Sequence, residues 1–121
     1  MTNSIVMNKS KKFAIRIIRL YQYLTDKKRE YVISKQLLRS GTGIGANICE
    51  ALKGQSKKDF VAKFHIALKE ACESEYCIEL LYETDYLKES EFTSIMSDCG
   101  EINKLLISII KSTKKLLTVN C

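Results

Sequence analysis

Residues 39–51 have the sequence Arg-Ser-Gly-Thr-Gly-Ile-Gly-Ala-Asn-Ile-Cys-Glu-Ala, which contains three of the five glycines in this 121-residue chain. Residues 41–46, Gly-Thr-Gly-Ile-Gly-Ala, match the G-x-G-x-x-A pattern of the phosphate-binding turn in dinucleotide-binding folds. That turn requires a β-strand directly before it and a βαβ unit around it. The preceding residues 31–39 instead place their apolar side chains at helical spacing, with Lys, Gln and Ser between them. A nucleotide site is therefore not expected in this stretch.

A helix that continues through the glycines, from about residue 31 to residue 53, explains the stretch better. With roughly 100° of rotation per residue, apolar side chains fall on one face, and polar or small ones gather on the other. Each glycine costs a helix roughly 1 kcal/mol relative to alanine. Three together indicate that a neighbouring helix packs where a larger side chain would not fit. The predicted packing residues on this helix are Gly41, Gly43, Gly45, Asn47 and Glu50.

The rest of the chain predicts three more helices, at about residues 9–26, 57–87 and 91–118. Apolar side chains recur in each at intervals of three and four, which is the pattern of a bundle helix. The chain has no proline and its connections are short, so neighbouring helices must run antiparallel. These observations predict a single domain, residues 1–121, with an all-α fold: an antiparallel up-and-down four-helix bundle.

Glycines and serines mark the predicted helix ends. Gly54 is expected to cap the second helix in the left-handed conformation that glycine adopts freely. Ser56, followed three positions later by Asp59, is expected to cap the start of the third helix. Ser90 is expected to cap the start of the fourth helix. Gly100, inside that helix, is expected to mark another close contact.

The predicted third helix has two apolar faces. Its principal face runs from Phe60 to Tyr82, and a second row contains Ile66, Tyr76 and Leu80. A helix in an isolated bundle needs only one buried stripe, so the second row predicts a contact between subunits. Carboxylates beside this row are expected to act as counter-ions at such contacts. The residues of this helix assigned to oligomer or helix packing are Glu70, Glu73 and Tyr76.

Charge is divided unevenly along the chain, whose net charge is +6. Residues 1–69 hold 15 Lys and Arg against 4 Asp and Glu, whereas residues 70–121 hold 5 against 10. Either the two halves attract each other between helices or subunits, or the basic half meets an anionic partner. An ordinary solvated face explains the same numbers equally well.

Cations and an aromatic ring share one side of the predicted first helix, away from its apolar stripe. This arrangement suits a nucleic-acid backbone and an unstacked base, although an ordinary exposed face gives the same pattern. Further cations follow along the chain. Together, the candidate nucleic-acid-binding residues are Lys12, Arg16, Arg19, Tyr23, Lys27, Lys28, Arg29, Lys35 and Arg39.

The cysteines and the single histidine show no pattern of catalytic or metal-binding residues. The five cysteines lack metal-ligand spacing, and their odd number suits free thiols in a reducing compartment. Four are expected in or near the core, and Cys121 is terminal. His65 is expected to be partly buried in a helix, and it lacks the Glu-x-x-His spacing of a di-iron bundle. We predict no enzymatic activity, no metal and no cofactor.

The apolar runs of the chain are short. The longest are only a few residues, too few to cross a membrane, and the N-terminal residues lack the apolar core of a signal peptide. A cytoplasmic protein without a membrane partner is expected.

A combination of fragments makes the stretch from about Arg39 to Leu81 specific. The fragments given at the end of this paragraph follow one pattern, from which two positions in this stretch depart. Gly43 stands where serine is common, and Cys49 stands where alanine is common. Both changes replace one small residue by another. The fragments are Arg39-Ser40, Gly45-Ala46-Asn47-Ile48, Glu50-Ala51, Ser56, Asp59-Phe60 and Ile66-Ala67-Leu68-Lys69-Glu70-Ala71. Together they resemble the four helix bundle protein family, which is also called the 23S ribosomal RNA intervening-sequence protein family.

This resemblance implies an assembly and a functional context. Members of the family look like ring-shaped homopentamers, whereas the sequence alone supports an oligomer without a subunit number. Relatives are encoded within intervening sequences of bacterial large-subunit ribosomal RNA genes. Others resemble the accessory protein of diversity-generating retroelements, a basic bundle that partners a reverse transcriptase and nucleic acid.

The sequence and the resemblance together lead to one functional expectation and one alternative. The chain is expected to be a non-catalytic homo-oligomer that binds RNA or DNA or acts as a scaffold, with a nucleic-acid-handling protein as a further partner. The alternative is a structural protein–protein adaptor that does not bind nucleic acid and whose basic half meets an acidic partner.

Overall fold

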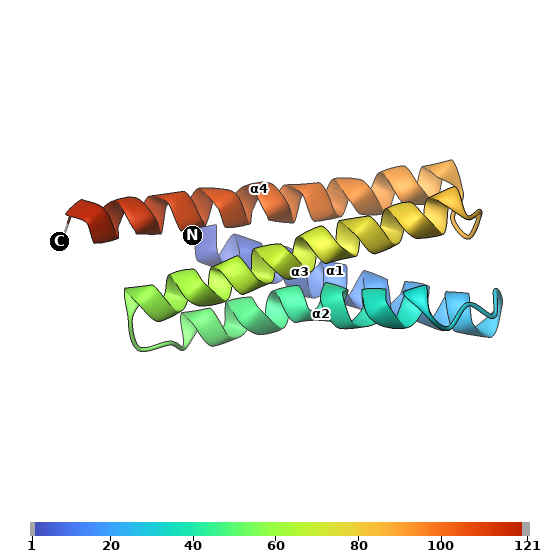
Figure 1. Cartoon of the computed structure of the whole chain (residues 1–121), viewed down its shortest axis with the longest axis horizontal. Helices are drawn as coiled ribbons and strands as arrows, with labels where there is room; N and C mark the ends of the chain where they lie inside the picture. The colour runs from blue at the N-terminus through green and yellow to red at the C-terminus, as the bar shows by residue number, and fades with distance from the viewer. Residues whose placement is uncertain (1, 120–121) are drawn as a thin grey trace.

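The computed structural model describes residues 2–119, with the side chains of residues 3–116, and contains four α-helices. They are α1 (Thr2–Asp26), α2 (Ile33–Leu52), α3 (Lys57–Glu83) and α4 (Glu89–Val119). Each helix contacts the next one in the chain, and α1 also contacts α4. The α1–α2 and α3–α4 connections lie at one end of the bundle, and the α2–α3 connection lies at the other (Figure 1). The predicted antiparallel four-helix bundle is therefore confirmed.

The helix ends differ from the predicted ones. α1 begins at Thr2 rather than near residue 9, because Val6 and Ser10 are fully buried and continue its inner stripe by two turns. α3 ends at Glu83 rather than near residue 87. Asp85 follows with a positive φ of 71°, which turns the chain out of the helix, and the buried Leu87 belongs to the connection.

Of the predicted caps, only the one at Ser56 is confirmed. Its side chain accepts a hydrogen bond from the Asp59 amide at 3.1 Å. The prediction for Gly54 was wrong, because no glycine in the described residues has a positive φ, and its amide donates to the Ala51 carbonyl instead. The prediction for Ser90 was also wrong. This residue lies inside α4. At the start of that helix, the Glu91 carboxylate accepts a hydrogen bond from the Lys88 amide.

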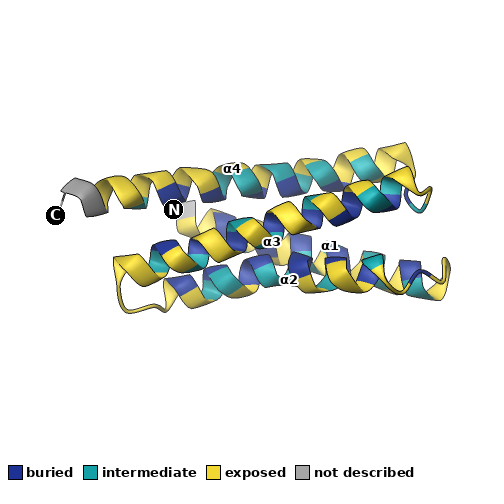
Figure 2. Cartoon of the chain, viewed as in Figure 1, coloured by how far each residue is buried: buried dark blue, intermediate teal, exposed yellow. Residues whose placement is uncertain are grey.

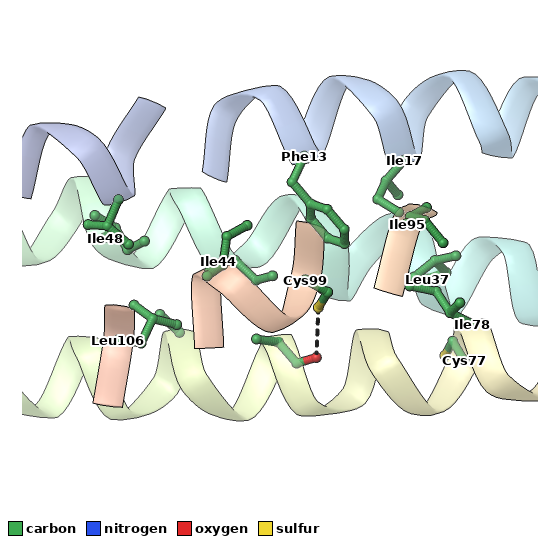
Figure 3. Packing of buried hydrophobic residues seen from close by; sticks show 14 of the residues in the cluster. Phe13, Ile17, Leu37, Ile44, Ile48, Cys77, Ile78, Ile95, Cys99 and Leu106 are labelled. Atoms are coloured by element: carbon green, nitrogen blue, oxygen red, sulfur yellow. Dashed lines mark hydrogen bonds between the residues drawn. The ribbon is translucent and has the colours of Figure 1, made fainter. Parts of the chain in front are cut away.

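The core runs along the whole bundle and follows the predicted stripes. Buried positions line the inner sides of all four helices, and exposed ones face outward (Figure 2). Figure 3 shows how these side chains interdigitate in the middle of the bundle. The largest fully buried side chains are Phe13, Phe64, Ile17, Leu24, Leu37, Ile44, Ile48, Ile78, Leu81, Ile102, Leu106 and Val6.

The expected burial of His65 and of Cys72 was wrong. His65 is exposed on α3, because it lies on the side of the helix opposite the buried Phe64 and Ala67. Cys72 is exposed for the same reason, whereas Cys77 and Cys99 are buried as expected. Cys49 is half-buried. The terminal Cys121 lies outside the described residues.

The helical glycines have different surroundings. A Cβ atom at Gly41 would lie 2.9 Å from both γ carbons of Ile17, so α2 approaches α1 there more closely than any side chain allows. A Cβ at Gly43 would lie 3.0 Å from a carboxylate oxygen of Glu70, whereas Gly45 has only ordinary contacts near 3.5 Å. A Cβ at Gly100 would meet no atom of another helix within 4 Å, so the close contact predicted there was wrong.

We expect Gly41→Ala and Gly100→Ala to change stability in opposite directions. At Gly41, overpacking against a buried β-branched side chain costs roughly 1–3 kcal/mol, which exceeds the gain in helix propensity. At Gly100, the added methyl group meets open space, so the variant gains up to roughly 1 kcal/mol of propensity. Urea unfolding of both variants measures the two effects. Equal stability of Gly41→Ala and the parent would contradict the close contact with Ile17.

Candidate nucleic-acid interface

Part of the predicted basic stripe on α1 is neutralised by α4. Arg16 forms an ion pair with Asp98 at 2.7 Å, and about two turns earlier Lys9 pairs with Glu101 at 2.8 Å. The hydrogen bond to Glu101 raises the pKa of Lys9, and the same bond lowers the pKa of Glu101. The basic and acidic halves of the chain thus attract each other within one subunit. Sequence reasoning missed these partners, although Asp98 and Glu101 share one face of α4.

The other members of the stripe remain available to solvent. Lys12 is exposed, and the Arg19 guanidinium contacts only the neighbouring Gln22 amide oxygen at 3.5 Å. Tyr23 is 41% exposed, and the Lys28 ammonium lies 6.0 Å from the centre of its ring. The stripe therefore ends in an aromatic ring with a cation beside it.

The α1–α2 connection holds the densest group of exposed cations near this ring. Lys27, Lys28 and Arg29 are exposed and form no ion pair with any described residue. Arg29 has a positive φ of 57°, the left-handed conformation that non-glycine residues rarely adopt. The Lys27 amide donates to the Tyr23 carbonyl at 2.8 Å, so the connection turns directly out of the last turn of α1.

Glu30 fixes the end of this connection, a role that sequence reasoning missed. Its carboxylate accepts hydrogen bonds from the amides of Val32, Ile33 and Ser34 at 3.2, 2.9 and 2.7 Å. These are amides at the start of α2 that have no partner within the helix. Burial raises the pKa of Glu30, but the backbone hydrogen bonds outweigh it, so its pKa falls below the ordinary value. The signal was an acidic residue just before the first apolar position of the helix.

Two predicted cations lie on α2, away from this connection. Lys35 and Arg39 are both exposed. Arg39 lies close enough to Glu70 of α3 to favour the ionised form of that carboxyl. The structure therefore places Arg39 with the predicted packing residues rather than with the α1 cations.

The predicted packing residues other than Gly41 and Gly45, which face α1, lie on the outer side of α2 and α3. The Asn47 side chain donates to the Gly43 carbonyl at 2.8 Å, and Glu50 pairs with Lys63 at 2.9 Å. Burial and the neighbouring Glu73 raise the pKa of Glu70. We call this region the α2–α3 surface; it consists of Arg39, Gly43, Ala46, Asn47, Glu50, Ile66, Glu70, Glu73 and Tyr76.

Apolar groups remain uncovered on this surface. Tyr76 is 62% exposed and Ile66 is 40% exposed. The second apolar row predicted for the third helix is therefore present and is not covered by any other helix of the subunit.

The buried thiols have no features of a nucleophile. Burial raises the pKa of Cys99 to about 12, and its thiol donates to the Ala71 carbonyl (Figure 3). Burial also raises the pKa of Cys77. Within the described residues, no group of three or more His, Cys, Asp or Glu side chains could hold a metal ion. No helix in the described part of the chain is long and apolar enough to span a membrane.

Fold and surface together define a basic helical-bundle protein with one exposed apolar side and one cationic connection. Residues 2–108 match the family described as 23S rRNA-intervening sequence protein, and the chain belongs to this family. It is 55% identical to a crystallised protein of unknown function from the S23 ribosomal protein family of Bacteroides thetaiotaomicron VPI-5482. The match covers 92% of this chain and 99% of that one, with a TM-score of 0.91. A comparison with curated proteins gives no match.

We expect Glu30→Ala to destabilise the bundle in a pH-dependent way. Because folding lowers the pKa of this carboxyl, its contribution is present above the unfolded-state pKa and is lost as the pH falls through the folded-state value. The variant should lose about 0.5–2 kcal/mol at neutral pH, as other N-terminal caps do. Thermal unfolding from pH 7 down to pH 3 should show the difference shrinking in acid. The exposed Glu79, changed to alanine, is the control and should show no such dependence.

Proposed function

We propose that this chain is a non-catalytic, homo-oligomeric protein that binds RNA or DNA through α1 and the α1–α2 connection. One observation carries the proposal: several exposed cations on these two segments form no ion pair with any acidic side chain among the described residues. Lys12, Lys27, Lys28 and Arg29 are all of this kind, whereas Arg16 is held by Asp98. Unpaired cations on one surface supply the counterion release that drives binding to a phosphate backbone.

The α2–α3 surface supports the homo-oligomeric part of the proposal. Tyr76 and Ile66 expose apolar area that the described part of the subunit does not cover, and the small, exposed Ala46 leaves room for close approach. A ring-shaped assembly, with five subunits as the resemblance implies, would cover this surface and repeat the cationic connection once per subunit. Repetition raises avidity without any new contact.

One observation favours the protein–protein adaptor as a second candidate. Ile15 and Ile18 lie on α1, 49% and 39% exposed. Apolar side chains beside cations suit an acidic protein partner as well as they suit nucleic acid. The two functions therefore differ in their dependence on phosphate contacts, which salt titration measures.

We expect Lys12→Glu with Arg19→Glu to weaken binding to a labelled structured RNA roughly tenfold or more at low salt. The double variant should also lower the slope of log affinity against log salt by about 2, one per lost phosphate contact. Arg16 is left unchanged, because its ion pair with Asp98 also joins two helices.

The matched control is Lys57→Glu with Lys58→Glu, an equal change of charge at the opposite end of the bundle. Its affinity should fall less and its salt slope should change less. Equal losses in both double variants would mean that only net charge matters. A parent protein that binds no nucleic acid at low salt would leave the adaptor as the better function.

We expect light scattering of the parent to give a mass several times 13.8 kDa. Ile66→Glu with Tyr76→Glu should reduce the mass to that of one chain, because two carboxylates cannot be buried in an apolar contact without partners. Ile107→Glu changes a similarly exposed isoleucine on α4 and should leave the assembly intact. A monomeric parent would refute the assembly. If the double variant is still oligomeric, the interface lies on another surface.

A further inference from the structure

Beside Tyr23 the bundle has a groove between the end of α1 and the start of α4. It has a volume of about 210 Å³ and is lined by Arg16, Leu20, Tyr23, Leu87, Glu91 and Ile95. Pockets that take drug-sized ligands are larger, roughly 300–1,000 Å³, so the size suits a single ring system. We propose that this groove binds one unstacked base of a single-stranded nucleic acid, and that it selects guanine. The inference rests on the proposed function and names the form of nucleic acid that is bound.

The walls of the groove suit the faces of a planar base. Leu20, Leu87 and Ile95 provide apolar contacts, and Tyr23 adds an aromatic ring. Aromatic side chains stack on bases of any sequence, but only where the base is not already stacked in a duplex. A single strand can therefore use the groove, and a duplex cannot.

The polar groups of the groove suit the edge of guanine. Glu91 contributes an acidic side chain, and only one of its oxygens has a partner, the Lys88 amide at 3.0 Å. A carboxylate accepts two parallel hydrogen bonds, and guanine offers adjacent N–H donors on its Watson–Crick edge. Arg16 holds Asp98 with one of its terminal nitrogens, which leaves N–H groups for the guanine carbonyl.

The charges around the groove orient the strand. Lys28 lies over the Tyr23 ring, and Lys27 and Arg29 are its neighbours in the connection, so phosphates beside a stacked base meet unpaired cations. The α4 side carries Glu89 and Glu91, which repel phosphates. The backbone is therefore held on the side of the α1–α2 connection, and the base points toward α4.

Fluorescence anisotropy with three labelled probes tests this inference: an oligouridine, the same oligouridine with one central guanosine, and a blunt-ended RNA duplex. The guanosine probe should bind more tightly than the plain oligouridine. Tyr23→Ala should weaken binding of the guanosine probe about 5- to 100-fold, the effect of losing one base stack, and leave binding of the duplex unchanged. Tyr23→Phe keeps the ring and should bind as the parent does. Glu91→Gln keeps the acceptor for Lys88 but should remove the preference for guanosine.

Tyr31→Ala is the matched control, because Tyr31 is 53% exposed at the same end of the bundle but does not line the groove. Circular dichroism of each variant establishes that it is folded. If the parent binds the duplex and the single strands alike, and Tyr23→Ala changes neither, the groove takes no base although the proposed function stands. An equal loss in Tyr31→Ala would also overturn the assignment to the groove. If the parent binds none of the probes, the proposed function itself fails.

Discussion

The contact between Gly41 and Ile17 determines how α1 and α2 sit against each other, and the remaining helices follow from it. Because α2 has no side chain at this position, Ile17 packs directly on its backbone. The adjacent Ser40 faces the other neighbour, since the Ser74 hydroxyl of α3 donates to it at 3.0 Å. Consecutive residues of a helix point roughly 100° apart. Two small side chains in a row therefore place α2 at the corner between α1 and α3.

The fourth helix closes the bundle by other means. Against α3 it has the buried Cys99, whose thiol reaches the Ala71 carbonyl, and the Asn103 amide, which donates to Glu75 at 2.6 Å. Against α1 it adds two partly exposed ion pairs, Lys9–Glu101 and Arg16–Asp98, to the shared apolar core. The groove beside Tyr23 lies at this seam, where Leu20 of α1 and Ile95 of α4 both line it.

Periodicity predicted the number, order and direction of the helices, because a bundle helix shows its buried side through spacing alone. The cap at Ser56 was predictable because both partners lie within one turn. The partner of Arg16 was not, since Asp98 is 82 positions away and the match depends on how each helix is rotated. Gly100 and Gly41 are both helical glycines, but a Cβ atom would meet Ile17 at Gly41 and open space at Gly100. Composition cannot distinguish a glycine that allows contact from one that merely costs helix propensity.

Among the candidate site residues, the sequence identified the cations but not which of them form ion pairs. Lys28 and Arg16 look alike in the chain, yet one is unpaired and the other is held by a carboxylate. Glu30 was overlooked because its three hydrogen bonds go to the backbone, and glutamate is not among the residue types that usually cap the start of a helix. Sequence therefore locates a charged region, and only the fold says which charges remain for a partner.

The different exposure of the thiols makes the opening of the bundle measurable. Cys72 is exposed on α3, whereas Cys99 is enclosed between α3 and α4 with a pKa of about 12. An alkylating reagent attacks the thiolate, so it modifies the outer cysteine in the folded protein but reaches the inner one only when the helices separate. The rate of the second reaction reports how often the bundle opens, and it does so in the native chain without an added label.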